Sequence, residues 1–185
     1  MSLTRTAPRS ASGRFMIGHP ARWIALGLGS GLSPKAPGTV GTLWAWAAFL
    51  VLEHWLTPQG WALLIGAGCC VGLWACTRTA QHLGLADPGA IVWDEIVAFW
   101  LVLWLVMPAP WWMQGAAFVL FRFFDAAKPG PVAWADALFK AAPGEPIGWA
   151  QGVGILFDDL VAAGCTLLVL ALAVKAWPVA QAVWG

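Results

Sequence analysis

Long apolar runs alternate with short polar segments along most of the chain. Within each run the apolar residues are continuous and do not alternate with polar ones, which is typical of helices rather than of half-buried strands. The runs cover residues 43–56, 61–76, 91–107, 111–124 and 155–174. The pattern therefore predicts an all-α protein, built as a compact bundle of about five apolar helices.

Prolines and polar residues separate the runs, and no segment repeats another. Pro58 follows the first run, and Pro108 and Pro110 follow the third. Prolines at these places are expected to end helices or to begin the next ones. The sequence thus predicts one helical domain. Its predicted extent is 23–176, after a basic, disordered arm over 1–22 and before a tail over 177–185.

The composition indicates that the bundle is embedded in a membrane. Hydrophobic residues make up 60% of the chain and charged residues only 10%, whereas a soluble domain carries about 25% charged residues. The 15 tryptophans suit a water–lipid boundary. Several runs are shorter than the roughly 20 residues that cross a bilayer, so shallow or partly embedded helices remain an alternative. A very apolar soluble protein or an obligate oligomer is another.

The distribution of charge predicts an orientation in the membrane. The net charge of +1 gives no sign of nucleic-acid binding. With the basic N-terminus in the cytoplasm and every run crossing the bilayer, nine of the ten Lys and Arg residues lie on the inner side, and only Lys175 does not. This agrees with the positive-inside rule. The acid-free, Arg- and Ser-containing arm would also suit a transit peptide, although it lacks the apolar region of a secretory signal.

Acidic residues gather at three places that this orientation puts at the cytoplasmic ends of the runs. These residues are Asp94, Glu95, Asp125, Asp158 and Asp159. Carboxylates brought together repel one another and raise each other's pKa unless a cation lies between them. Mg²⁺ prefers such hard oxygen ligands and often also binds a substrate phosphate. The clusters therefore predict a Mg²⁺ site. The alternative, acids that complement helix N-termini, suits Asp94 or Asp158 singly and suits Asp125 badly.

Two further groups of residues suit an anion such as phosphate. The segment 27–42 is rich in Gly, Ser and Thr, and its small residues let backbone N–H groups approach an anion. A flexible linker would have the same composition. Arg122 and Lys128 flank Asp125, where a salt bridge at a helix end is the alternative reading. Cations, a Gly/Ser/Thr loop and carboxylates at one membrane face together indicate phosphoryl chemistry on a lipid.

Four motifs resemble the phosphatidylglycerophosphatase A family of bacterial enzymes. In chain order they are GLGSGLSPKAPGTVGTLWA, DPGAIVWDEIVAFW, FRFFDAAKPGP and GILFDDLVAAG. The resemblance implies a Mg²⁺-dependent phosphatase of the inner membrane that works at the cytoplasmic leaflet. Its substrate would be phosphatidylglycerophosphate, converted to phosphatidylglycerol and inorganic phosphate in glycerophospholipid biosynthesis.

The resemblance also implies roles for individual residues. The metal ligands would be Asp94, Glu95, Asp125, Asp158 and Asp159. The catalytic residues would be Asp94, Glu95 and Asp159. The substrate contacts would be Ser33, Lys35, Thr39, Arg122 and Lys128.

Two other classes of protein stay open at this point. A small transporter or proton-relay protein would use intramembrane carboxylates, but would carry them mid-helix around a pore. A non-catalytic scaffold would use its Trp-rich helices to bind partners. Assembly into a homo-oligomer is also open. The four Cys residues lack the paired spacing of a zinc site, which leaves the carboxylates as the candidate chemistry.

Overall fold

The computed structural model describes residues 10–140 and 146–184, and within these ranges it is built from helices without any strand. This confirms the all-α prediction. The helices are α1 (Gly13–Ile17), α2 (Pro20–Ala25), η1 (a 3₁₀ helix, Gly27–Leu32), α3 (Pro37–Leu52), α4 (Pro58–Leu83), α5 (Trp93–Val106), α6 (Trp111–Ala127), α7 (Pro131–Leu138) and α8 (Trp149–Trp184). The five apolar runs fall in α3, α4, α5, α6 and α8, and the remaining helices are additions to that set.

The N-terminal arm is more ordered than the sequence predicted. Its residues from Gly13 onward form α1 and α2, and Ala21 is fully buried. The predicted disorder is therefore wrong for residues 13–22, while residues 1–9 lie outside the described part of the chain. The reason is local: Ser12 and His19 each accept a hydrogen bond from a backbone N–H and cap these two short helices, which satisfies their first turns.

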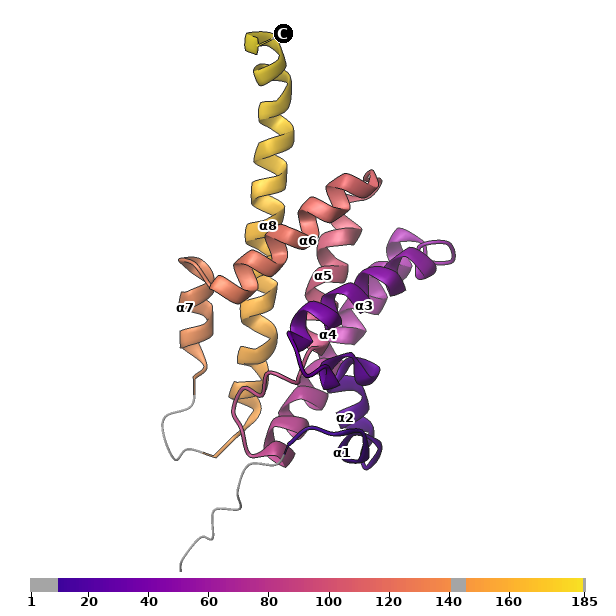
Figure 1. The fold of residues 1–185 in the computed structure, drawn as a ribbon, viewed down its shortest axis with the longest axis vertical. Coiled ribbons are helices and arrows are strands. Elements are labelled where there is room, and N and C mark those ends of the chain that lie inside the picture. The colour runs from indigo at the N-terminus through magenta and orange to yellow at the C-terminus, as the bar shows by residue number, and fades with distance from the viewer. Residues whose placement is uncertain (1–9, 141–145, 185) are drawn as a thin grey trace, which may run out of the picture.

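Helix α5 is the centre of the bundle. It contacts α3, α4, α6 and α8, and most of its side chains from Ile96 to Leu103 are buried. The longest helix, α8, runs along the long axis of the molecule, and its C-terminal half extends beyond the other helices (Figure 1). Helix α6 crosses α8, and α7 lies beside the first half of α8.

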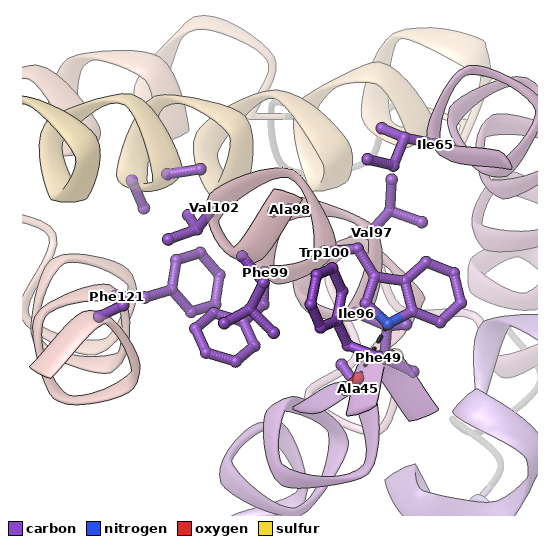
Figure 2. Close-up of a cluster of buried hydrophobic side chains, with 14 of the residues drawn as sticks. Ala45, Phe49, Ile65, Ile96, Val97, Ala98, Phe99, Trp100, Val102 and Phe121 are labelled. Carbon is purple, nitrogen blue, oxygen red and sulfur yellow. Dashed lines mark hydrogen bonds between the residues drawn. The ribbon is translucent and has the colours of Figure 1, made fainter. Parts of the chain in front are cut away.

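Aromatic side chains fill the core and fix these helices against one another. Phe99 of α5 packs on Phe121 of α6 with ring centres 5.5 Å apart, and Phe49 of α3 stacks on Trp61 of α4 at 4.4 Å. The indole of Trp100 donates a hydrogen bond of 2.9 Å to the carbonyl of Ala45, as drawn in Figure 2. Rings packed in this way hold the helix ends in place.

Two helices have the length and composition to cross a membrane, Pro58–Leu83 and Trp149–Ala176. Helix α3 is apolar but has only 16 residues, and α5 has 14, which is short of the roughly 20 residues that a crossing needs. Large apolar side chains are exposed on both long helices, among them Leu63 and Leu172. The fold therefore hints at membrane association through α4 and α8, while the embedding of the whole bundle stays a prediction.

Candidate active site

The three acidic clusters lie near one another at the meeting point of α5, α6 and α8. Asp94 and Glu95 occupy the first turn of α5, Asp125 lies in the last turn of α6, and Asp158 and Asp159 belong to the first third of α8. The charges of both Asp125 and Asp158 act on Asp94. Residues up to 65 positions apart along the chain therefore share one electrostatic environment.

Helix dipoles explain only part of this arrangement. Asp94 and Glu95 do lie at a helix N-terminus, where negative charge is favourable. Asp125, in contrast, lies at the C-terminal end of α6, where a negative charge is unfavourable. Asp158 and Asp159 are buried in the interior of a long helix. A site that needs carboxylates accounts for all the positions, and the dipole does not.

Arg122 links two of the clusters. Its Nη1 donates to Glu95 Oε1 at 2.9 Å, forms an ion pair with Asp125, and lies 3.4 Å from Thr42 Oγ1. The close approach of α3 depends on Gly38, because a Cβ there would stand 2.0 Å from Glu95 Oε1. Arg122 thus neutralises one side of the acidic group while α3 covers it.

Lys128 forms a second charged network on the other side of Asp158. It ends α6 in the left-handed conformation, which turns the chain toward α7. Its Nζ contacts Asp136 Oδ1 at 2.6 Å and also forms an ion pair with Asp158. Asp136 in turn pairs with Lys140. Although burial acts to lower it, the hydrogen bonds to Asp136 and Asp158 raise the pKa of Lys128, so this side chain stays positively charged.

Asp136 was not predicted from the sequence as a residue of the site. It lies eight positions after Lys128, across the turn formed by Pro129, Gly130 and Pro131. The two residues lie on either side of the break between α6 and α7, so no helical or strand period relates them and the pairing depends on the turn. Burial acts to raise the pKa of Asp136, but hydrogen bonds from Lys128 and Lys140 outweigh it and lower the value. Asp136 is therefore a carboxylate held in its charged form.

Several buried polar atoms of the site lack a hydrogen-bond partner within the described residues. They include Asp94 Oδ1, Glu95 Oε2 and Arg122 Nε. Burial and the charge of Glu95 raise the pKa of Asp94 well above its usual value. Burial and the charge of Asp125, opposed by Arg122, raise the pKa of Glu95 to about 8. Unpaired polar atoms are costly in a protein interior, so these oxygens are in place to meet another group.

The oxygen donors suit a hard divalent cation in their chemistry, but they are not arranged as a finished metal site. No three His, Cys, Asp or Glu side chains within residues 10–140 and 146–184 surround one point closely enough to hold an ion. Glu95 and Asp125 are paired with Arg122, and Asp158 is paired with Lys128. Asp94 and Asp159 form no ion pair with any described Lys or Arg, and are the acids most available to a cation.

The predicted substrate contacts divide into two groups. Arg122 and Lys128 lie among the carboxylates, as described above. Ser33 instead donates a hydrogen bond of 2.8 Å to the carbonyl of Lys35, the Lys35 side chain is exposed, and Thr39 is half-buried in the first turn of α3. Within the described chain, these three side chains make no hydrogen bond or ion pair with the acids. Their segment approaches the acids at Gly38, which packs against Glu95 and lies in the same turn of α3 as Thr39.

Replacing Arg122 with Met is expected to destabilise the protein by about 3–5 kcal/mol, because Glu95 and Asp125 would lose their cation in a buried place. Denaturant unfolding in detergent would measure the free energy change. Arg122→Lys is the matched control, since it retains a positive charge and should lose less. Equal stability of Arg122→Met and the wild type would show that the carboxylates do not depend on this residue.

Comparison with known proteins identifies relatives over most of the chain. The family model described as Phosphatidylglycerophosphatase A matches residues 23–174. Phosphatidylglycerophosphatase A of Escherichia coli is 36% identical over 168 residues, which cover 91% of each chain. The enzyme of the same name from Haemophilus influenzae is 33% identical over 159 residues, 86% of this chain and 91% of the relative.

A third relative carries a different name. It is a Bacteroides thetaiotaomicron protein, named as a proposed phosphatidylinositol-3-phosphatase, and it is 36% identical over 157 residues, 81% of this chain and 91% of the relative. No solved structure matches the chain. The region that the family model matches begins in α2 and ends in α8, so it includes all the acids described above and both cations, Arg122 and Lys128.

Proposed function

The chain belongs to the phosphatidylglycerophosphatase A family, and from this premise we propose that it hydrolyses phosphatidylglycerophosphate to phosphatidylglycerol and inorganic phosphate. The observation that carries the proposal is the meeting of buried and half-buried carboxylates from α5, α6 and α8 with two cations, Arg122 and Lys128. A phosphomonoester needs positive groups for its oxygens and an acceptor for the proton of water. The site has both kinds of group.

The cofactor of the proposed reaction is Mg²⁺. Asp94 and Asp159 would hold it, with Glu95, Asp125 and Asp158 as the neighbouring carboxylates. When bound, the ion supplies a Lewis acid that polarises the phosphoryl group and stabilises the charge of the transition state. The two orphaned oxygens, Asp94 Oδ1 and Glu95 Oε2, support this assignment, because hard oxygen atoms are the ligands that Mg²⁺ prefers.

The residues of the chain then have distinct tasks. Arg122 and Lys128 bind phosphate oxygens and orient phosphorus toward the carboxylates. Glu95 Oε2, which has no partner among the described residues, accepts the proton of the attacking water. The water oxygen forms the new bond to phosphorus as the bond to the glycerol oxygen breaks, and that oxygen takes a proton from solvent. Burial in the bundle limits other water near the phosphate.

The proposed location is the bacterial inner membrane, with the site facing the cytoplasm. Helices α4 and α8 would cross the bilayer. The C-terminal end of α4, with Arg78, and the N-terminal end of α8 lie at the same end of the molecule as α1 and α2, which carry Arg14 and Arg22 (Figure 1). That gathering of cations follows the positive-inside rule. Inside-out vesicles should hydrolyse added substrate, and activity of sealed right-side-out vesicles alone would reverse this orientation.

The direct test is phosphate release from phosphatidylglycerophosphate by the purified protein in detergent micelles with Mg²⁺. We expect turnover that rises with the mole fraction of the lipid. The transporter alternative is not favoured, because the E. coli and H. influenzae relatives are named as phosphatases. A protein that releases no phosphate from this lipid would contradict the proposed function.

A further inference from the structure

A small cavity of about 210 Å³ adjoins the site on the far side of Asp158. Its walls come from three elements: the loop between α4 and α5, which contributes Asp87, the end of α7 with Asp136, and the first turns of α8 with Gln151. Asp136 and Asp158, the two acids that hold Lys128, both line it. The cavity therefore shares a wall with the residues that would bind the phosphate.

The size of the cavity suits a small head group. Liquid water takes up about 30 Å³ per molecule, so the space corresponds to roughly seven waters. A three-carbon polyol fits such a volume, whereas the acyl chains of a lipid need a larger and more apolar space. The side chain of Ile155 also lines the wall and gives the carbon atoms of a polyol an apolar surface.

The polar groups of the cavity suit hydroxyls better than a second phosphate. Asp87 and Asp136 offer acceptors, and the one cation among the described lining residues, Lys140, is already paired with Asp136. Gln151 Oε1 accepts from the N–H of Gly148 at 2.7 Å, which leaves its amide N–H groups as donors. Hydroxyls both donate and accept, while a phosphate would meet mostly negative charge here.

We propose that this cavity binds the glycerol of the substrate head group, next to the phosphate that is removed, and that Gln151 and Asp87 determine specificity for it. The inference rests on the proposed function. The phosphate that is removed lies at Lys128, and the glycerol that carries it extends past Asp158. Its one free hydroxyl enters the cavity, while the phosphodiester at its other end stays outside. Lipid phosphates that lack this polyol, such as phosphatidate, gain nothing from the cavity.

The test compares Gln151→Leu with the wild type on two lipids, phosphatidylglycerophosphate and phosphatidate, at equal mole fractions in the same detergent micelles with Mg²⁺. We expect kcat/KM for phosphatidylglycerophosphate to fall about tenfold, as for the loss of one hydrogen bond to the substrate. The value for phosphatidate should stay within about twofold. Ala86→Leu, which adds bulk to another wall residue, should give the same selective loss.

Gln81→Leu is the matched control. Gln81 bonds the carbonyl of Ile147 at 2.9 Å, and so secures the chain just before α8 without lining the cavity. In Gln81→Leu, the kcat/KM values for the two lipids should change by the same factor or not at all. Equal losses on both lipids in Gln151→Leu and Ala86→Leu, or no loss on either, would overturn the inference alone. A wild-type protein that hydrolyses neither lipid would overturn the proposed function and the inference with it.

Discussion

Replacing Asp159 with Asn is expected to lower the rate of phosphate release by at least about a thousandfold while the protein stays folded. The substitution removes a charge that forms no ion pair with any described Lys or Arg, at nearly constant volume. If that charge holds the cation, its loss should raise the barrier by about 4 kcal/mol. The measurement is kcat in Mg²⁺-containing micelles, with the melting temperature of the same sample.

The stability of the Asp159→Asn variant shows whether Asp159 serves the reaction or holds the fold together. Asp159 is only 3% exposed, and an unpaired buried charge destabilises a fold. Asn should therefore leave the melting temperature unchanged or raise it. Glu53→Gln, at the end of α3 and away from the acids, is the control and should keep activity within about twofold. More than a tenth of wild-type activity in Asp159→Asn would remove this residue from the catalytic set.

Removing divalent ions is expected to reduce the activity at least about a hundredfold, and added Mg²⁺ should restore it. The reason is that the carboxylates of α5, α6 and α8 repel one another, and Arg122 and Lys128 neutralise only some of them. Activity in EDTA, followed by titration with Mg²⁺, measures the effect. Full activity in EDTA would mean that Arg122 and Lys128 alone supply the positive charge, and would end the metal proposal without touching the identity of the substrate.

The same site predicts how stabilisation by Mg²⁺ depends on pH. The pKa of Glu95 is raised to about 8 in the folded protein, against about 4.3 in an unfolded chain. The folded state thus binds a proton that the unfolded state releases, and without metal its stability falls as the pH rises from about 4.3 to 8. A bound cation lowers the pKa and removes this loss. The rise in melting temperature on adding Mg²⁺ should be larger at pH 8.5 than at pH 6, and smaller in Glu95→Gln.

The helices could be predicted from the sequence because each apolar run is continuous and ends at a proline or a polar turn. The nearness of Asp94, Asp125 and Asp158 was predicted too, from an alternating path of the helices, although Asp158 lies in the interior of α8 and not at its end. Asp136 could not, because its pairing with Lys128 depends on a left-handed turn that no periodicity reveals. The helices within residues 13–25 were not predicted, because the segment is charged and of low hydropathy. Its capping residues therefore drew no attention as helix starts.

The segment 27–42, which forms η1 and the start of α3, shows where composition alone was insufficient. Its Gly, Ser and Thr residues suited an anion cradle or a flexible linker. In the structure Ser33 bonds to the carbonyl of Lys35, and Gly38 allows close packing on Glu95, while anion binding stays a prediction. Small residues can thus serve helix packing at one position and a turn at another. A segment that contains both has the same composition as a phosphate-binding loop. Arg122 and Lys128 were better indicators, because charged side chains in an apolar sequence need partners.

The length of α8 bears on how a lipid could reach the site. At about 1.5 Å per residue, its 36 residues measure about 54 Å, well beyond the roughly 30 Å of bilayer hydrocarbon. If the residues of α8 after Asp159 cross the bilayer, the first ten or so residues of α8 lie outside the hydrocarbon. The acids then lie at the depth of the lipid head groups. A lipid would then be processed by lateral diffusion alone, its tails never leaving the leaflet. Turnover would follow the surface density of the lipid rather than its bulk concentration.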